Sequence, residues 1–235
     1  MCGRAFDEYA VNYDGWFLDN LSVLESEVRL LAKAIGDAGR ALSVGCGSGL
    51  FEMLLRQDHG IEIAAGVEPA KAMAEIARKR GLDVRDARAE SLPFPDGDFD
   101  TVVMNGTPSY IADFEAAARE AWRVLRPGGR AVVLDVPKES SYGLLYRLAS
   151  EVGTWDHPAL EGVAPEVPYP IEFAAEANWR TTREKREILA SAGFTGFEHF
   201  QTLTRHPLYS NDGAEEPVPG HDRGDYVAIV AGKTA

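Results

Sequence analysis

The sequence predicts a three-layer α/β fold, in which a parallel sheet carries helices on both faces. From residue 41 to residue 136, short apolar runs alternate with segments whose apolar residues recur every three or four positions. Strands that alternate with helices in this way form parallel sheets, because the chain must return to the starting edge of the sheet before each new strand. A glycine-rich turn between the first strand and its helix fits the same architecture.

The expected elements follow from these patterns. Strands are expected at 41–45, 61–68, 82–87, 98–105 and 128–136. Helices are expected between them at 50–57, 70–80 and 114–125. A further helix is expected at 19–36, with one apolar face formed by Leu21, Leu24, Val28, Leu31 and Ile35.

The alternation stops after residue 136. Residues 137–180 are rich in proline and aromatic residues, and we expect an insertion that lies over the site. A helix is then expected from Thr181, where Glu184 completes a possible capping box. Two last strands are expected at 194–204 and 225–232, joined through a polar, linker-like stretch at 210–224.

Composition excludes several classes of protein. The net charge is −13, from 24 basic and 37 acidic residues, and a nucleic acid would be repelled by such a surface. No segment approaches the roughly 20 apolar residues of a membrane span, and the N-terminus does not resemble a signal peptide. Cys2 and Cys46 are too few for a disulfide framework. A cytoplasmic protein without a membrane span or a nucleic-acid partner is expected.

The turn from Val44 to Gly49 (VGCGSG) is the strongest local signal. Glycines between a strand and a helix let the backbone approach a ligand and aim the helix N-terminus at it. Glu68 ends the next strand, at the distance expected for a carboxylate that accepts hydrogen bonds from a ribose diol. Together they indicate an adenosine-type nucleoside. NAD enzymes share this arrangement, but the dinucleotide fingerprint would need glycine at Leu50.

Several motifs in order then carry a resemblance. The segments ALSVGCGSG, GVEPAKAMAEIARKRG, AESLPFPDGDFDTVVMN and VLRPGGRAVVLD resemble the successive motifs of class I methyltransferases that depend on S-adenosyl-L-methionine (SAM). The similarity is strongest to the ubiquinone and menaquinone biosynthesis group, and it covers residues 40–136. It implies a Rossmann-like, seven-stranded, mostly parallel sheet whose last strand, at 225–232, is antiparallel.

The resemblance also implies the cofactor site. The turn would line the methionine and ribose of SAM, Glu68 would hold the ribose hydroxyls, and the segment after the fourth strand would approach the transferred methyl. Tyr13, on an N-terminal helical segment with Tyr9 and Trp16, would close over the cofactor, although these aromatics could equally be core residues. The implied cofactor-binding set is Tyr13, Val44, Gly45, Cys46, Gly47, Gly49, Glu68, Pro69, Ala70, Ala89, Glu90, Asn105, Gly106 and Thr107.

Two positions depart from the family pattern. Arg88 stands where many relatives have an aspartate that accepts from the adenine amino group, and arginine has only donors. Either Asp86 takes that role, or backbone and water meet the amino group. Tyr110 stands roughly where relatives often have a histidine, so the acceptor chemistry is expected to differ.

No catalytic residue is assigned. Methyl transfer from a sulfonium is a direct displacement, for which alignment and exclusion of water suffice. Tyr110, Asp135, His157 and His199 are candidate bases, each more simply explained as a structural or surface residue. His206 and His221 flank acidic residues without a metal-ligand spacing, and no metal is expected.

The chain is therefore expected to be one methyltransferase domain. Its parts would be an N-terminal helical cap (1–39), a SAM-binding core (40–136), a lid insertion (137–180), and a C-terminal helix with strands (181–235). The lid aromatics would cover a small-molecule methyl acceptor or pack a dimer contact, so the protein would be a monomer or a homodimer. S-adenosyl-L-homocysteine would be the second product. A SAM-binding protein without turnover and an NAD-type oxidoreductase are the alternatives.

Overall fold

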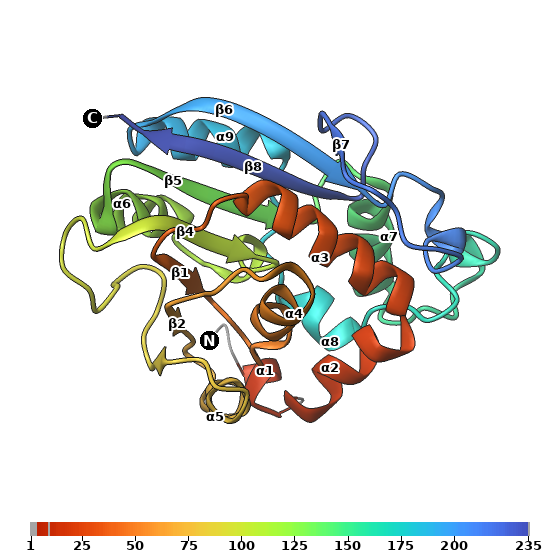
Figure 1. Cartoon of the computed structure of the whole chain (residues 1–235). Coiled ribbons are helices and arrows are strands. Elements are labelled where there is room, and N and C mark those ends of the chain that lie inside the picture. Colours follow the sequence, from red (N-terminus) through yellow and green to blue (C-terminus); the bar gives the residue numbers. More distant parts are fainter. Residues whose placement is uncertain (1–3, 9, 235) are drawn as a thin grey trace.

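A twisted mixed sheet runs through the middle of the molecule (Figure 1). The computed structural model describes residues 4–8 and 10–234, and within them the predicted α/β fold is confirmed. The sheet of the described residues has eight strands in the order β3-β2-β1-β4-β5-β8-β6-β7. Their bounds are β1 Ala41–Val44, β2 Ala65–Val67, β3 Val84–Arg85, β4 Phe99–Asn105, β5 Leu125–Asp135, β6 Phe194–Thr202, β7 Val218–Pro219 and β8 Tyr226–Lys233.

The expected antiparallel last strand is present. Strands β1 to β5 pair in parallel, and β8 is inserted antiparallel between β5 and β6. The sheet exceeds the expected seven strands by β7, a two-residue strand antiparallel to β6. This strand comes from the stretch expected to be a linker. That stretch is instead tied down, because buried Glu215 accepts hydrogen bonds from the backbone N and Oγ1 of Thr204.

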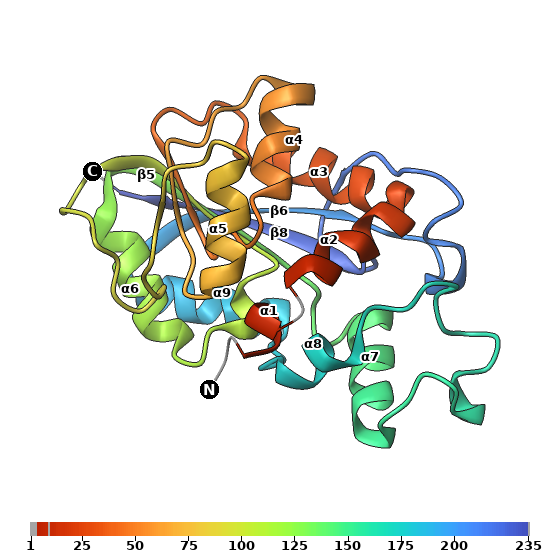
Figure 2. The ribbon, with the colours of Figure 1, turned by 90° about the horizontal axis from the view of Figure 1, so that it is seen from below.

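Alternation along the central strands explains the layers. Val103, Val132 and Leu134 face the core shared with α3 and α4. Val102 and Val133 face the core shared with α6 and α9 on the other side of the sheet (Figure 2). The helices are α1 Arg4–Glu8, α2 Ala10–Asp19, α3 Leu21–Ile35, α4 Leu50–His59, α5 Lys71–Lys79, α6 Phe114–Val124, α7 Ser141–Val152, α8 Ile171–Glu176 and α9 Thr182–Ser191.

Two helices, α9 and α3, can be compared with specific sequence predictions, a capping box and an apolar face. The predicted capping box is confirmed at the start of α9, where Thr181 Oγ1 accepts from Glu184 N and the Glu184 carboxylate accepts from Thr181 N. The predicted apolar face of α3 needs one correction. Leu21 is 61% exposed because α3 begins there, and the charged residue Glu27 is only 6% exposed on the buried face.

Segments from both halves of the chain cover one edge of the sheet. The insertion forms α7 and α8, and α8 lies between α7 and α1 (Figure 2). Phe6 of α1 stacks on Phe173 of α8 with ring centroids 4.8 Å apart, and Tyr13 of α2 meets the same ring edge-on. Tyr9, which was grouped with Tyr13, lies outside the described residues, as does Cys2. Among the described helices none is long and apolar enough to cross a membrane.

Candidate functional site

A pocket opens where β1, β2 and β4 end, and we call it the turn pocket. Its empty space is about 730 Å³, part of it open to solvent. Ten of the residues expected at the site line it: Tyr13, Gly45, Gly47, Glu68, Pro69, Ala89, Glu90, Asn105, Gly106 and Thr107. Residues far apart in the sequence therefore meet at one edge of the sheet.

The glycine turn packs tightly on the end of β4. Gly45 N donates to Val67 O at 2.7 Å, and Thr107 Oγ1 donates to Gly45 O at 3.1 Å. A Cβ added to Gly45 would lie 2.4 Å from Cγ2 of Thr107, so this position cannot carry a side chain. Gly47, at φ +54°, has no protein atom within 4 Å of an added Cβ. Since Gly47 lines the pocket, its missing side chain leaves room for a ligand.

Glu68 connects the turn to the end of β2. Its Oε2 accepts from Gly47 N at 2.9 Å, and its Oε1 accepts from Ala70 N at 2.8 Å. Burial raises the pKa of this carboxyl to about 7, although the two backbone hydrogen bonds act in the opposite direction. Two hydrogen bonds leave further lone pairs on the carboxylate, so it can also accept from a ligand.

Four expected residues lie behind the pocket surface. Val44 is fully buried in β1, and the Cys46 thiol packs with Ala74 beneath the turn. A Cβ on Gly49 would meet Ala77 of α5. Ala70 is buried, and its N–H holds Glu68. These residues shape the turn from behind, and their direct contact with a cofactor stays a prediction.

Some lining residues carried little signal in the sequence. Phe6, Met73 and Ile111 line the turn pocket, but apolar residues at these spacings look like ordinary core positions. Arg88 lines it too, as expected from its place in the motif. Asp86, the alternative acceptor for an adenine amino group, is ion-paired with Arg78 and does not line the pocket.

A second hollow continues from the first, and we call it the aromatic chamber. It shares Tyr13, Asn105, Gly106 and Tyr110 with the turn pocket and encloses about 570 Å³. Its other lining residues are Trp16, Phe17, Glu27, Phe51, Ser109, Asp135, Val136, Tyr146, Tyr169, Ala177, Trp179 and Tyr226. Tyr146, Tyr169 and Trp179, all from the insertion at 137–180, therefore line a cavity next to the turn pocket.

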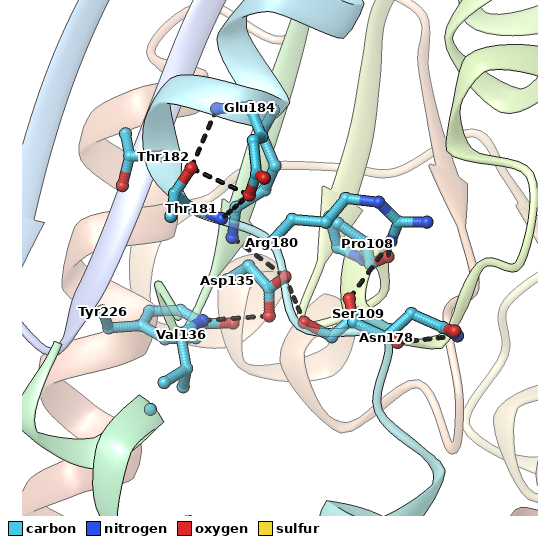
Figure 3. Close-up of polar contacts among 12 residues, drawn as sticks. Pro108, Ser109, Asp135, Val136, Asn178, Arg180, Thr181, Thr182, Glu184 and Tyr226 are labelled. Carbon is cyan, nitrogen blue, oxygen red and sulfur yellow. Dashed lines mark hydrogen bonds and ion pairs between the residues drawn. The ribbon is translucent and has the colours of Figure 1, made fainter. Parts of the chain in front are cut away.

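Asp135 ends β5 at the floor of the chamber (Figure 3). Its Oδ2 accepts from Ser109 Oγ at 2.7 Å and from Lys185 Nζ at 3.0 Å, and its Oδ1 accepts from Val136 N at 2.9 Å. Lys185 and Asp135 side chains are only 3% and 6% exposed. This carboxylate is thus engaged by the fold and is a poor candidate for a free base.

Residues 178–180, at the end of the insertion, are hydrogen-bonded to residues 108–111, which follow β4 (Figure 3). Asn178 N donates to Ser109 O at 2.5 Å, and the Arg180 guanidinium donates to the carbonyls of Pro108 and Ile111 at 2.9 and 3.1 Å. These bonds hold the segment after β4 against the lid. Tyr110 on that segment lies where pocket and chamber meet, with its hydroxyl 3.4 Å from that of Tyr169.

The histidine candidates lie elsewhere. His157 and His199 line neither cavity, and His157 Nδ1 instead accepts from Ala159 N at the start of a 3₁₀ turn, Pro158–Leu160. The rings of His199 and His221 lie 4.6 Å apart in a tilted arrangement, and His206 Nδ1 accepts from Leu208 N at the 3₁₀ turn Pro207–Tyr209. In the described part of the chain, no three His, Cys, Asp or Glu residues form a group that could hold a metal.

Comparisons with known proteins agree on the kind of domain. The family described as a methyltransferase domain matches residues 42–133. A demethylmenaquinone methyltransferase of Thermus thermophilus is 36% identical over 61% of this chain and 70% of that protein. An uncharacterized protein of Methanocaldococcus jannaschii is 31% identical over 98% of this chain and 99% of that protein.

One solved structure matches over its full length. It is a SAM-dependent methyltransferase from Thermotoga maritima, described as a possible histamine N-methyltransferase. The two chains are 32% identical, with a TM-score of 0.84 over 100% of each. The domain match begins in β1 and ends in β5, so it spans the glycine turn, Glu68 and the segment from Asn105 to Thr107.

The buried pair below the chamber leads to a first prediction. Lys185→Met leaves the Asp135 carboxylate buried without its cation and should cost about 3–5 kcal/mol in the free energy of unfolding. Adding Asp135→Asn removes the stranded charge and should recover much of that loss. Denaturant unfolding of both variants measures the difference, and a Lys185→Met protein as stable as the wild type would contradict it.

Proposed function

Because the chain belongs to the class I SAM-dependent methyltransferases, we propose that it transfers the methyl group of SAM to a small molecule held in the aromatic chamber. SAM is accordingly its cofactor. The observation that carries the proposal is the continuity of the two hollows. The turn pocket and the chamber share Tyr13, Asn105, Gly106 and Tyr110, so a group at their junction is reached from both sides.

The residues of the turn pocket suit the cofactor. The open space in front of Gly47 would admit the cofactor, and the buried Glu68 carboxylate would accept from the two ribose hydroxyls. Ala89 and Glu90 would lie along the adenine, as the sequence resemblance implies. Arg88 cannot accept from the adenine amino group and Asp86 is paired with Arg78, so backbone carbonyls or water would do so.

The residues of the chain would position the cofactor and the acceptor relative to one another. Bound SAM supplies a methyl group already activated on a sulfonium. Asn105, Gly106 and Thr107 would hold its methionine end at the junction, while Tyr13 and Tyr110 wall the passage to the acceptor. Tyr226 Oη donates to Asn105 Oδ1 at 3.0 Å, which fixes that side chain. The aromatic rings exclude water, and alignment in a dry site is what a displacement of this kind needs.

The alternatives fit less well. An NAD enzyme would need glycine at Leu50, which is instead buried at the start of α4. A SAM-binding protein without turnover would not need a second, aromatic hollow that opens into the first. The names of the two relatives point to different acceptors, demethylmenaquinone and histamine, so the acceptor must be sought in this chain's own chamber.

The proposal is tested by calorimetric titration with SAM, S-adenosylhomocysteine and NAD. Micromolar binding of the first two, an affinity of about −8 kcal/mol, is expected, with no binding of NAD. Binding of NAD alone would overturn the proposal. Failure of all three to bind would indicate a fold that has lost its cofactor.

The pKa of Glu68 predicts how cofactor affinity depends on pH. With a pKa of about 7, Glu68 is mostly protonated at pH 6 and mostly ionised at pH 8. Ribose hydroxyls donate to the ionised form, so the affinity for S-adenosylhomocysteine should rise about tenfold between these pH values, with proton release on binding. Calorimetry in buffers of different ionisation enthalpy measures both quantities.

Glu68→Gln is the control for that titration. The variant should bind more weakly by about 1.5–3 kcal/mol, the range for hydrogen bonds to a charged group, and should lose the part of the pH dependence that Glu68 causes. If wild type and Glu68→Gln gave parallel pH profiles, Glu68 would not hold the ribose.

A matched pair of glycines tests the position of the cofactor. Gly47 and Gly60 both have a left-handed backbone, with φ of +54° and +65°, and an added Cβ meets no protein atom at either. Alanine should therefore cost each about 1–2 kcal/mol of stability. Only Gly47→Ala should also weaken S-adenosylhomocysteine binding, because only its methyl group enters the turn pocket. Equal affinity of the two variants would contradict the placement.

A further inference from the structure

Glu27 lies in an unusual place for a carboxylate. It stands on the buried face of α3 between Leu24 and Val28, is 6% exposed, and lines the aromatic chamber. Among residues 4–8 and 10–234, its carboxyl group has no hydrogen-bond donor and no ion-pair partner. Burying such a group without a partner is costly, so its retention on an apolar helix face calls for a partner from outside the fold.

The other buried carboxylates show the contrast. Asp135 is paired with Lys185, and Glu68 accepts from two backbone N–H groups. Glu215 accepts from Thr204, and Asp225 accepts from Tyr142 N at 2.9 Å. Each of these has a structural task within the described part of the chain, and Glu27 has none.

No cation among the described residues shifts the pKa of Glu27, and the Lys185 ammonium is bonded to Asp135 instead. Asp135 of β5 acts on Glu27, and Glu27 in turn raises the pKa of nearby tyrosines: Tyr13 of α2, Tyr142 and Tyr146 of α7, Tyr169 before α8, and Tyr226 of β8. Burial, with a smaller contribution from Asp135, raises the pKa of Glu27 to about 8. A cation placed beside it would lower that pKa and regain the energy that burial costs.

The walls of the chamber also favour a cation. Trp16, Tyr146, Tyr169 and Trp179 present aromatic rings to it, and the ring faces attract ammonium groups. The lining residues with a carboxyl group, among those described, are Glu27 and Asp135, and no lysine or arginine lines the chamber. An anionic acceptor would thus find no lysine or arginine on these walls.

We propose that the aromatic chamber takes an acceptor that carries a protonatable amine on an apolar or planar body, and that the Glu27 carboxylate binds the amine. This inference rests on the proposed function, because it assigns the acceptor class of the same site. Glu27 touches the acceptor in this account, whereas Asp135, held by Lys185 and Ser109, shapes the floor.

The test compares three probes of similar size: phenethylamine, its neutral isostere phenethyl alcohol, and para-ethylphenol. Each is titrated calorimetrically into the protein with and without saturating S-adenosylhomocysteine. The amine should bind about tenfold more tightly than the alcohol, the factor expected for a charge-assisted hydrogen bond. Equal binding of amine and alcohol, tighter binding of the phenol, or no binding of the amine would overturn the proposal.

Two variants assign the preference to one residue. Glu27→Gln keeps the shape but not the charge and should abolish the preference for the amine. Glu25→Gln, on the exposed side of the same helix where Glu25 pairs with Arg29, should retain it. Retention of the preference in Glu27→Gln would overturn the role of Glu27. Because the probes are also titrated without S-adenosylhomocysteine, a failure of cofactor binding is seen separately from a failure of amine binding.

Thermal unfolding supplies a readout that is independent of any probe. The pKa of Glu27 is about 8 in the fold against 4.5 for an ordinary glutamate, so ionisation destabilises the fold progressively as pH rises through this range. Glu27→Gln should therefore raise the melting temperature at pH 9 relative to the wild type. A lower melting temperature at that pH would show that Glu27 serves the fold, and would overturn the proposal.

Discussion

The parallel pairing of β1, β2, β4 and β5 is the constraint on which the rest of the structure depends. Parallel strands all end at the same edge of the sheet, so the segments that follow them must converge there. This brings together the glycine turn, Glu68, Asn105 and Asp135. The bond from Gly45 N to Val67 O and the bond from the Thr107 hydroxyl to Gly45 O are possible only because Gly45 has no side chain. A ligand site at this edge follows from the topology.

The two hollows at that edge differ in chemistry because different parts of the chain close them. Backbone groups and Glu68 give the turn pocket its hydrogen-bonding capacity. The insertion at 137–180 and α2 give the chamber aromatic walls. Hydrogen bonds from the Arg180 guanidinium attach the end of the insertion to the loop after β4. Lys185 pairs with the Asp135 carboxylate, whereas the Glu27 carboxyl group has no partner among the described residues. This difference separates a structural carboxylate from one available to a substrate.

Much of this could be predicted from sequence because it is local. The strand, turn and helix from 41 to 59, the acidic residue ending β2 and the capping box at Thr181 each depend on neighbours in the chain. Aromatic cover of the site was expected from the composition of residues 137–180, but the full lining of the chamber could not be predicted, because its walls come from segments far apart in sequence. Lys185 reaches Asp135 across 50 positions, and Trp16 Nε1 donates to Val167 O across 151. The sequence did contain a signal for Glu27, since a glutamate stands there among apolar residues at helical spacing. The apolar face expected for α3 began at Leu21 and did not include Glu27.

The central claim is that the cofactor methyl reaches the aromatic chamber through the junction at Tyr13 and Tyr110. The most direct measurement uses SAM labelled with carbon-13 at the methyl group and protein with selectively protonated tyrosine rings. Isotope-filtered NMR should then show nuclear Overhauser effects from the methyl group to the rings of Tyr13 and Tyr110, removed by Tyr13→Leu and Tyr110→Leu in turn. A bound methyl group with no contact to either ring would contradict the account.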